Sequence, residues 1–201
     1  MQRSHGGWLA AVVVVTCSLS QAEASSRAAS DVEAMRVMTS ADHRQQPFAV
    51  VDKQAATISV YRADGVLAGT SAVLLGSMLG DHSMPGVGER TQTGQLRAND
   101  RTTPAGRFNS EPGRNRAGDA IVWVDYASAF AIHRLRAGPS KEQRSRLLQS
   151  ASAADKRVSD GCVVVPEAFF DAVVQPTLGR ARGVVYVLPE FGAQPALRQG
   201  I

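Results

Sequence analysis

The sequence predicts a mostly β domain with two or three helices. Short runs rich in β-branched and aromatic residues recur from residue 47 onward, separated by residues typical of tight turns. Two stretches with apolar residues at helical spacing interrupt these runs. The chain has 201 residues, of which 44% are hydrophobic and 20% charged, so it has room for one ordinary domain of a soluble globular protein.

The first strands are expected to form a meander. Residues 48–52 and 57–61 are two β-like runs, and residues 53–56 form the turn between them. Residues 63–65 (Ala-Asp-Gly) are a second turn signal, which leads into a third region of strand over residues 66–75.

The next segment, residues 76–113, is rich in glycine and proline and has almost no periodic apolar pattern. We expect a long irregular stretch that borders the substrate cleft. Strands return at residues 120–124 and 130–133, and residues 183–188 are a buried strand that closes the sheet.

Two helices follow the return of the strands. Ser140 is a candidate N-cap with Gln143 three residues later, which predicts a helix through about Ala151. Pro166 suits the first position of a second helix.

The N-terminus has the features of a secretory signal peptide over residues 1–24. A basic residue precedes the apolar stretch 8–19, and small residues follow at the spacing of a signal-peptidase site. A retained anchor is the alternative, and Cys17 leaves a lipoprotein site open. We expect export to the periplasm or cell envelope, with no integral membrane span after cleavage.

The remaining terminal segments are predicted to lie outside the folded domain. Residues 25–46 are rich in alanine, serine and short polar side chains, which indicates a flexible linker with at most a turn or two of helix over residues 31–38. Residues 191–201 are expected to be a C-terminal tail.

Charge and motifs exclude several functions. The formal net charge of +4 suits an anionic polymer such as a cell wall, and equally suits plain solubility. Aromatic residues make up 5% of the chain and no basic stripe is interleaved with them, which disfavours nucleic-acid binding. Neither His-Glu-Xaa-Xaa-His nor paired cysteines occur, so we expect no metal and no cofactor.

Cys162 would be the one thiol left after signal cleavage removes Cys17. A lone thiol in an oxidising compartment is either buried or used. Cys162 ends the run Ser-Asp-Gly-Cys, and Gly161 allows a tight bend in which consecutive N–H groups could form an oxyanion hole. A buried structural cysteine in an unrelated secreted domain is the alternative.

A thiol nucleophile also needs a base, because its ordinary pKa of about 8.5 leaves only a few per cent thiolate at neutral pH. Of the four histidines, only His133 ends a predicted strand, where a rigid scaffold would hold its ring. We therefore expect His133 to act as the base for Cys162. The alternative is that His133 is purely structural.

These residues resemble the L,D-transpeptidase catalytic-domain family (YkuD-like), whose signature is a strand ending in His followed by a Ser/Thr-His-Gly-Cys turn. Residues 102–108 are similar to the family's Thr-Pro-Xaa-Gly-Xaa-Phe segment, and residues 183–190 to a proteobacterial subgroup. The resemblance covers about residues 47–190 and implies a β-sandwich or barrel-like catalytic domain. The positions that match the signature are His133, Ser159, Gly161, Cys162 and Val163.

The resemblance implies an exported cysteine L,D-transpeptidase that acts on peptidoglycan stem peptides. Cys162 would form a thioester and transfer it to an acceptor amine, with Ser159 and Gly161 supporting the turn. We further predict that Asp160 binds the ammonium group of diaminopimelate and that Arg134 and Thr103 contact the substrate. We expect a monomer.

The chain departs from the family pattern at three places. Asp160 replaces the usual His or aromatic residue, Val164 stands where Arg or Asn is common, and the 29 residues from His133 to Cys162 (162 − 133) exceed the usual interval. Two alternatives on the same scaffold therefore stay open. One is an L,D-carboxypeptidase or hydrolase, and the other is a degenerate, non-catalytic peptidoglycan-binding protein.

Overall fold

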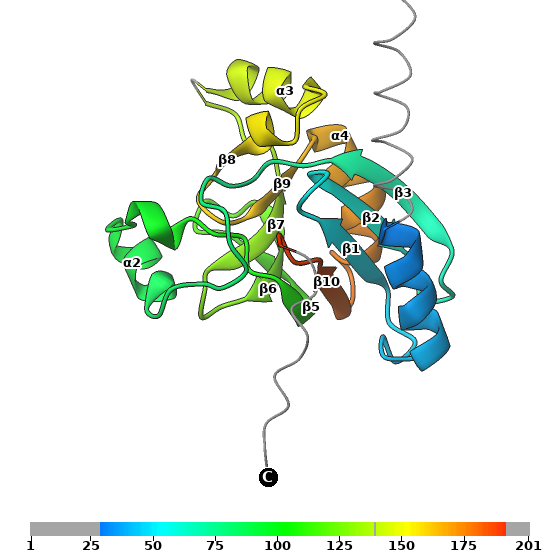
Figure 1. Ribbon diagram of the computed structural model, residues 1–201. Helices are drawn as coiled ribbons and strands as arrows, with labels where there is room; N and C mark the ends of the chain where they lie inside the picture. Colours follow the sequence, from blue (N-terminus) through cyan, green and yellow to red (C-terminus); the bar gives the residue numbers. More distant parts are fainter. Residues whose placement is uncertain (1–28, 139, 192–201) are drawn as a thin grey trace, which may run out of the picture.

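The computed structural model of the chain describes residues 29–138 and 140–191 (Figure 1). The fold is mostly β, as the sequence predicts. Within the described residues, no helix combines the length and the apolar character needed to span a membrane. The predicted signal peptide with Cys17, and residues 192–201 of the predicted tail, lie outside the described part of the chain.

Eight strands form one mixed sheet in the order β3-β2-β1-β10-β5-β6-β7-β9, and β4 pairs with β8 beside it. The strands are β1 (Phe48–Asp52), β2 (Thr57–Tyr61), β3 (Leu67–Ala72), β4 (Leu75–Gly76), β5 (Gly106–Arg114), β6 (Ala120–Asp125), β7 (Phe130–Arg134), β8 (Arg157–Ser159), β9 (Val163–Val165) and β10 (Gly183–Val187). The helical segments are α2 (Val87–Thr93), η1 (Ala98–Asp100), α3 (Lys141–Gln149), η2 (Ala154–Lys156), α4 (Glu167–Phe169), the π-helical η3 (Phe170–Val174) and α5 (Gln175–Thr177).

The sheet curls until its two ends meet. Beyond β3, Leu74 exchanges two backbone hydrogen bonds with Val164 of β9, with N···O distances of 2.8 and 2.9 Å. The result is a nearly closed barrel whose interior holds the main hydrophobic core, because alternate residues of each strand point inward. The predicted closing strand, β10, is buried as expected but lies in the middle of the sheet, parallel to β1 and antiparallel to β5.

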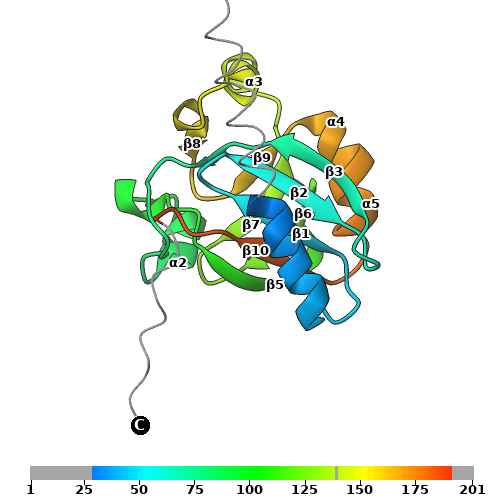
Figure 2. The same cartoon turned by 45° about the vertical axis from the view of Figure 1, so that its right-hand side comes forward.

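The prediction of a flexible linker is wrong from residue 29 onward. Residues 29–40 form a helix, seen in blue across β1 and β10 in Figure 2. Ala34 and Val37 of this helix pack on the outward side chains of Phe48, Tyr61 and Tyr186. The helix therefore covers the outer face of β1, β2 and β10.

The prediction of an irregular segment over residues 76–113 is also wrong in part. The segment contains α2 and most of β5, a nine-residue strand in the middle of the sheet. The side chains of Phe108, Ser110 and Pro112 alternate with outward residues along β5, and only Phe108 is a large apolar one. Because Ser110 and Pro112 are not large apolar residues, the sequence of β5 shows no clear alternation of apolar and polar residues.

The helix predicted from Ser140 forms α3, which packs on another part of the outer face. Leu148 of α3 lies in a small cluster with Leu74, Leu135 and Val164. Because Leu135 and Val164 belong to the β7 and β9 region, α3 is held over that end of the sheet (Figure 1).

A buried lysine joins β1 to the long segment that follows β4. Lys53 is completely buried, and its Nζ donates hydrogen bonds to the carbonyl oxygens of Gly80 and Thr103 and to Oδ1 of Asp81, at 2.6, 3.1 and 2.6 Å. Glu190 lies 3.8 Å from the same ammonium group. The ammonium group of Lys53 thus holds in place the segment that leads to Thr103.

Replacing Lys53 by methionine should destabilise the protein by about 3–5 kcal/mol, because two buried or partly buried carboxylates would lose their counter-ion. Lys141→Met is the matched control, since Lys141 forms an exposed ion pair with Glu167 and should cost less than about 1 kcal/mol. Urea unfolding measures both values. Equal losses in the two variants would contradict the role given to Lys53.

Candidate active site

The turn that carries Cys162 joins β8 to β9 and is fixed by its own serine. The Ser159 hydroxyl donates to the carbonyl of Cys162 at 2.6 Å and accepts the N–H of Gly161 at 3.2 Å. Gly161 has φ = 116°, and a Cβ atom there would lie 2.9 Å from the carbonyl oxygen of Thr102. Only glycine fits this position without strain.

Thr103 holds the same turn from the other side. Its hydroxyl donates to the carbonyl of Gly161 at 2.8 Å and accepts the N–H of Gly76 at 2.9 Å. Thr103 is 1% exposed. A buried hydroxyl with both bonds inside the protein does not face a substrate, which corrects the predicted substrate-binding role: Thr103 is a positioning residue.

The register of β7 and β9 brings Cys162 and His133 to one face of the sheet. His133 pairs with Val164 in parallel, and Cys162 lies two residues before Val164. Cys162 directly precedes β9. Continuing the alternation of the strand by one residue puts its side chain on the His133 side, near Ala131, whose backbone acts on the thiol. The backbones that carry the thiol and the imidazole are neighbours in the sheet, about 4.8 Å apart.

The imidazole of His133 is oriented by the backbone. Its Nδ1 lies 2.8 Å from the carbonyl oxygen of Arg134, which can only accept, so Nδ1 carries the proton and Nε2 is the acceptor. Burial lowers the pKa of His133 to about 4, and the charges of Arg136 and Arg144 act in the same direction. The ring is therefore neutral at neutral pH, with Nε2 able to take a proton.

The thiol of Cys162 is partly buried and donates to the carbonyl oxygen of Ala129 at 3.5 Å. Burial raises the pKa of Cys162, and the negative charge of Asp160 adds to this effect. The backbone of Ala131 and the charge of Arg136 act in the opposite direction. At neutral pH the thiol of Cys162 and the imidazole of His133 are thus both neutral.

Arg134 lies on the other face of β7. It follows His133 directly, and successive residues of a strand point to opposite sides. Its guanidinium pairs with Asp171 at 3.1 Å and lies 5.1 Å above the ring of Phe170. The predicted contact between Arg134 and the substrate is wrong for this reason.

Three arginines that the sequence reasoning missed lie around the site. Arg101 pairs with Asp160 at 3.1 Å, and the charges of Arg136 and Arg144 act on His133. The Nε atoms of Arg101 and Arg144 are buried without a hydrogen-bond partner in the described part of the chain. The three residues are separated from one another in the sequence, so no local pattern connects them. Their three positive charges exceed the single negative charge of Asp160.

No metal site accompanies these residues in the part of the chain that the structure describes, where no three His, Cys, Asp or Glu side chains gather as metal ligands do.

The sequence matches no protein-family model, and no curated protein matches it. The fold is similar to several solved structures. The helical cell shape determining protein Pgp2 from Campylobacter jejuni aligns with a TM-score of 0.49 and 14% identity over 74% of this chain and 49% of that one. This chain thus spans about half the length of that protein.

Two transpeptidases are also similar. The L,D-transpeptidase from Mycobacterium smegmatis aligns with a TM-score of 0.41 and 16% identity over 71% of this chain and 58% of that one. The catalytic domain of the Enterococcus faecium L,D-transpeptidase aligns with a TM-score of 0.36 and 18% identity over 72% and 98%. Because these identities and TM-scores are low, the function has to be inferred from the residues of the site.

The pKa of His133 makes the stability of the protein depend on pH. The folded state binds this proton near pH 4, whereas the unfolded chain binds it near 6.5, so stability falls as the pH drops from 6.5 to about 4. The loss amounts to roughly 3 kcal/mol at most. In urea unfolding at pH 7, 5.5 and 4.5, His133→Gln should lack this part of the decline. His82→Gln, which removes an exposed histidine, should retain it; parallel curves for wild type and His133→Gln would contradict the assignment.

Proposed function

We propose that the protein is an exported cysteine L,D-transpeptidase of the periplasm or cell envelope that acts on peptidoglycan stem peptides. The observation that supports this most strongly is the register of β7 and β9, in which His133 lies opposite Val164, two residues after Cys162, together with the Arg134 carbonyl that leaves Nε2 of His133 as an acceptor. A nucleophile beside a base that is itself oriented by a third group is the arrangement that acyl transfer requires.

In the proposed reaction, Nε2 of His133 takes the proton of the Cys162 thiol as the sulfur attacks the carbonyl of the third residue of a tetrapeptide stem. The C–N bond to the terminal D-alanine then breaks, and the imidazolium returns its proton to the leaving amine. The product is a thioester on Cys162. An acceptor amine attacks this thioester and loses its proton to His133, and the thiolate leaves and is reprotonated.

The oxyanion of this reaction needs a donor. The N–H of Gly161 is already bonded to Ser159, so we assign the role to the N–H of Cys162 itself. The sequence predicts that consecutive N–H groups of the turn share the oxyanion, and our proposal assigns it to one of them.

The arginines around the site suit a substrate that carries carboxylates. Val164, where the family commonly has Arg or Asn, is fully buried beneath α3. We propose that Arg136 and Arg144, which lie in the segment between β7 and the cysteine turn, bind the carboxylate of the departing residue instead. Water in place of the acceptor amine would make the same site a carboxypeptidase.

Incubation with a carbapenem should give one covalent adduct at Cys162, visible as an increase in intact mass, because a thiol nucleophile opens the lactam. Cys162→Ala should give none, and His133→Gln should slow acylation by about 10²–10⁴.

With a purified tetrapeptide muropeptide, wild type should release D-alanine. The ratio of cross-linked to hydrolysed product distinguishes transferase from hydrolase. Absence of both the adduct and D-alanine release would favour the non-catalytic binder.

Asp160→Asn separates two roles of this aspartate. Loss of its charge should lower the pKa of Cys162 and speed alkylation by iodoacetamide at pH 7.5. If Asp160 also binds an ammonium group, KM should rise for a diaminopimelate stem but not for the same stem with that amine acetylated. Such binding must displace Arg101 from Asp160. Equal KM changes for both stems would remove the ammonium hypothesis. Asp64→Asn is the control, because Asp64 is also 61% exposed and paired with an arginine.

A further inference from the structure

We propose that a groove on the outer face of β5 and β6 binds an N-acetylated hexosamine of the glycan strand, with Trp123 and Tyr126 as its stacking platform. This inference rests on the proposed function and names a further part of the same substrate. It places the sugar that carries the stem peptide on the face that bears Cys162.

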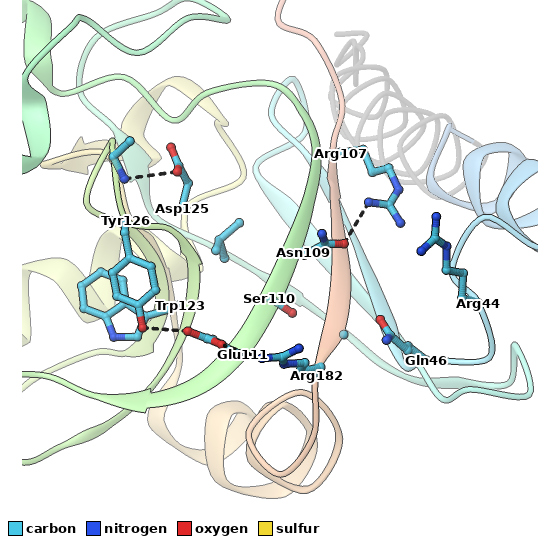
Figure 3. A pocket seen from close by; sticks show the side chains of 13 residues that line it. Arg44, Gln46, Arg107, Asn109, Ser110, Glu111, Trp123, Asp125, Tyr126 and Arg182 are labelled. Carbon is cyan, nitrogen blue, oxygen red and sulfur yellow. Dashed lines mark hydrogen bonds and ion pairs between the residues drawn. The ribbon is translucent and has the colours of Figure 1, made fainter.

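The groove has a volume of about 630 Å³, within the range of small-molecule sites, and includes neither Cys162 nor His133 (Figure 3). Its lining comes from β5, β6, the loop that precedes β1 and the start of β10. Trp123 and Tyr126 lie at one end of it, and Arg44 and Gln46 lie at the other (Figure 3).

The two aromatic rings pack against each other, and Tyr126 is the accessible one of the two. Their centroids are 4.6 Å apart with an interplanar angle of 30°, and Tyr126 is 59% exposed. The Tyr126 hydroxyl donates to Oε1 of Glu111 at 2.9 Å, which holds the ring in place. A Cβ atom on Gly113 would lie 2.4 Å from Cδ1 of Trp123, so glycine leaves the space that the indole occupies.

The chemistry of this surface suits a sugar. A hexopyranose has an apolar C–H face that can stack on an aromatic ring, with hydroxyl groups around its edge. Along the groove, Glu111, Asn109 and Gln46 offer hydrogen-bond acceptors and donors for hydroxyl and acetamido groups.

The charges of the groove favour this neutral ligand over a polyanion. Arg107 is paired with Asp42 at 2.7 Å, and Arg182 lies 3.9 Å from Glu111. Asp125 lies in the same groove. Arg44 also lines the groove, so an anionic polymer would meet two carboxylates, two arginines that already have partners and one further arginine.

The distance from this platform to the thiol matches the length of a stem peptide. Trp123 pairs with Ala131 of β7, and Cys162 lies opposite Ala131, so all three side chains point to one face. Two strand spacings make about 10 Å between Trp123 and Cys162. Three extended residues also span about 10 Å, so a peptide branch on a sugar at this platform is long enough for its third residue to reach Cys162.

Two measurements test the proposal. The first compares kcat/KM for a disaccharide-tetrapeptide with kcat/KM for the free tetrapeptide. Tyr126→Ala should lower this ratio by about tenfold, the loss expected from one stacking contact, and Phe191→Ala, which removes another exposed aromatic ring, should leave it unchanged. An unchanged ratio in Tyr126→Ala would overturn the proposal. An equal loss on both substrates would assign the groove to the peptide and would also overturn it.

The second measurement does not depend on catalysis. Titration with an N-acetylglucosamine tetramer should change the fluorescence of Trp123 in a saturable way, and Tyr126→Ala should weaken this binding by about tenfold. Absence of saturable binding to wild type would overturn the sugar site. Because carbapenem acylation of Cys162 is measured separately, a protein that is acylated but binds no tetramer keeps the proposed function and loses this inference. A protein that binds the tetramer without being acylated keeps this inference and loses the proposed function.

Discussion

The candidate site depends on the parallel register between β7 and β9. His133 lies opposite Val164, and this pairing puts the Cys162 thiol on the imidazole side of the sheet. A shift by one residue would turn Cys162 into the barrel and would move Val163 and Val165, which are both fully buried in the core, to the outer face. The packing of these two valines in the core and the position of the thiol are therefore one constraint. The bridge from Leu74 to Val164 fixes β9 along its other edge.

Both groups of the proposed pair are neutral at neutral pH. Burial keeps the imidazole neutral and the thiol protonated, and the Arg134 carbonyl fixes the tautomer that leaves Nε2 as the acceptor. A protonated thiol exchanges slowly with disulfides, because the thiolate is the reactive form. This property suits a single cysteine in the oxidising compartment that we propose for the protein.

Sequence reasoning found the residues whose environment is local and missed those that depend on the arrangement of distant segments. The turn at Cys162 and the strand that ends at His133 each have a clear pattern, because the glycine bend and the aliphatic run are contiguous. Arg134 was assigned to the site from its adjacency to His133, although adjacent residues of a strand point to opposite faces. The helix over residues 29–40 gave a weak signal, since it buries Ala34 and Val37 but exposes Val32 and Met35.

The elements that cover the barrel determine where a substrate can lie. The interior of the barrel is filled by the core, so binding has to occur on the outer face. The helix over residues 29–40 covers β1, β2 and β10, and α3 covers the end where Leu135 and Val164 lie. The groove lies on the outer face of β5 and β6, and the row from Glu111 through Trp123 and Ala131 leads from it to Cys162. A polymer carrying peptide branches could follow this row with its sugar at Trp123 and its branch directed at the thiol. The position of the covering helices would thus direct the proposed substrate as much as Cys162 itself does.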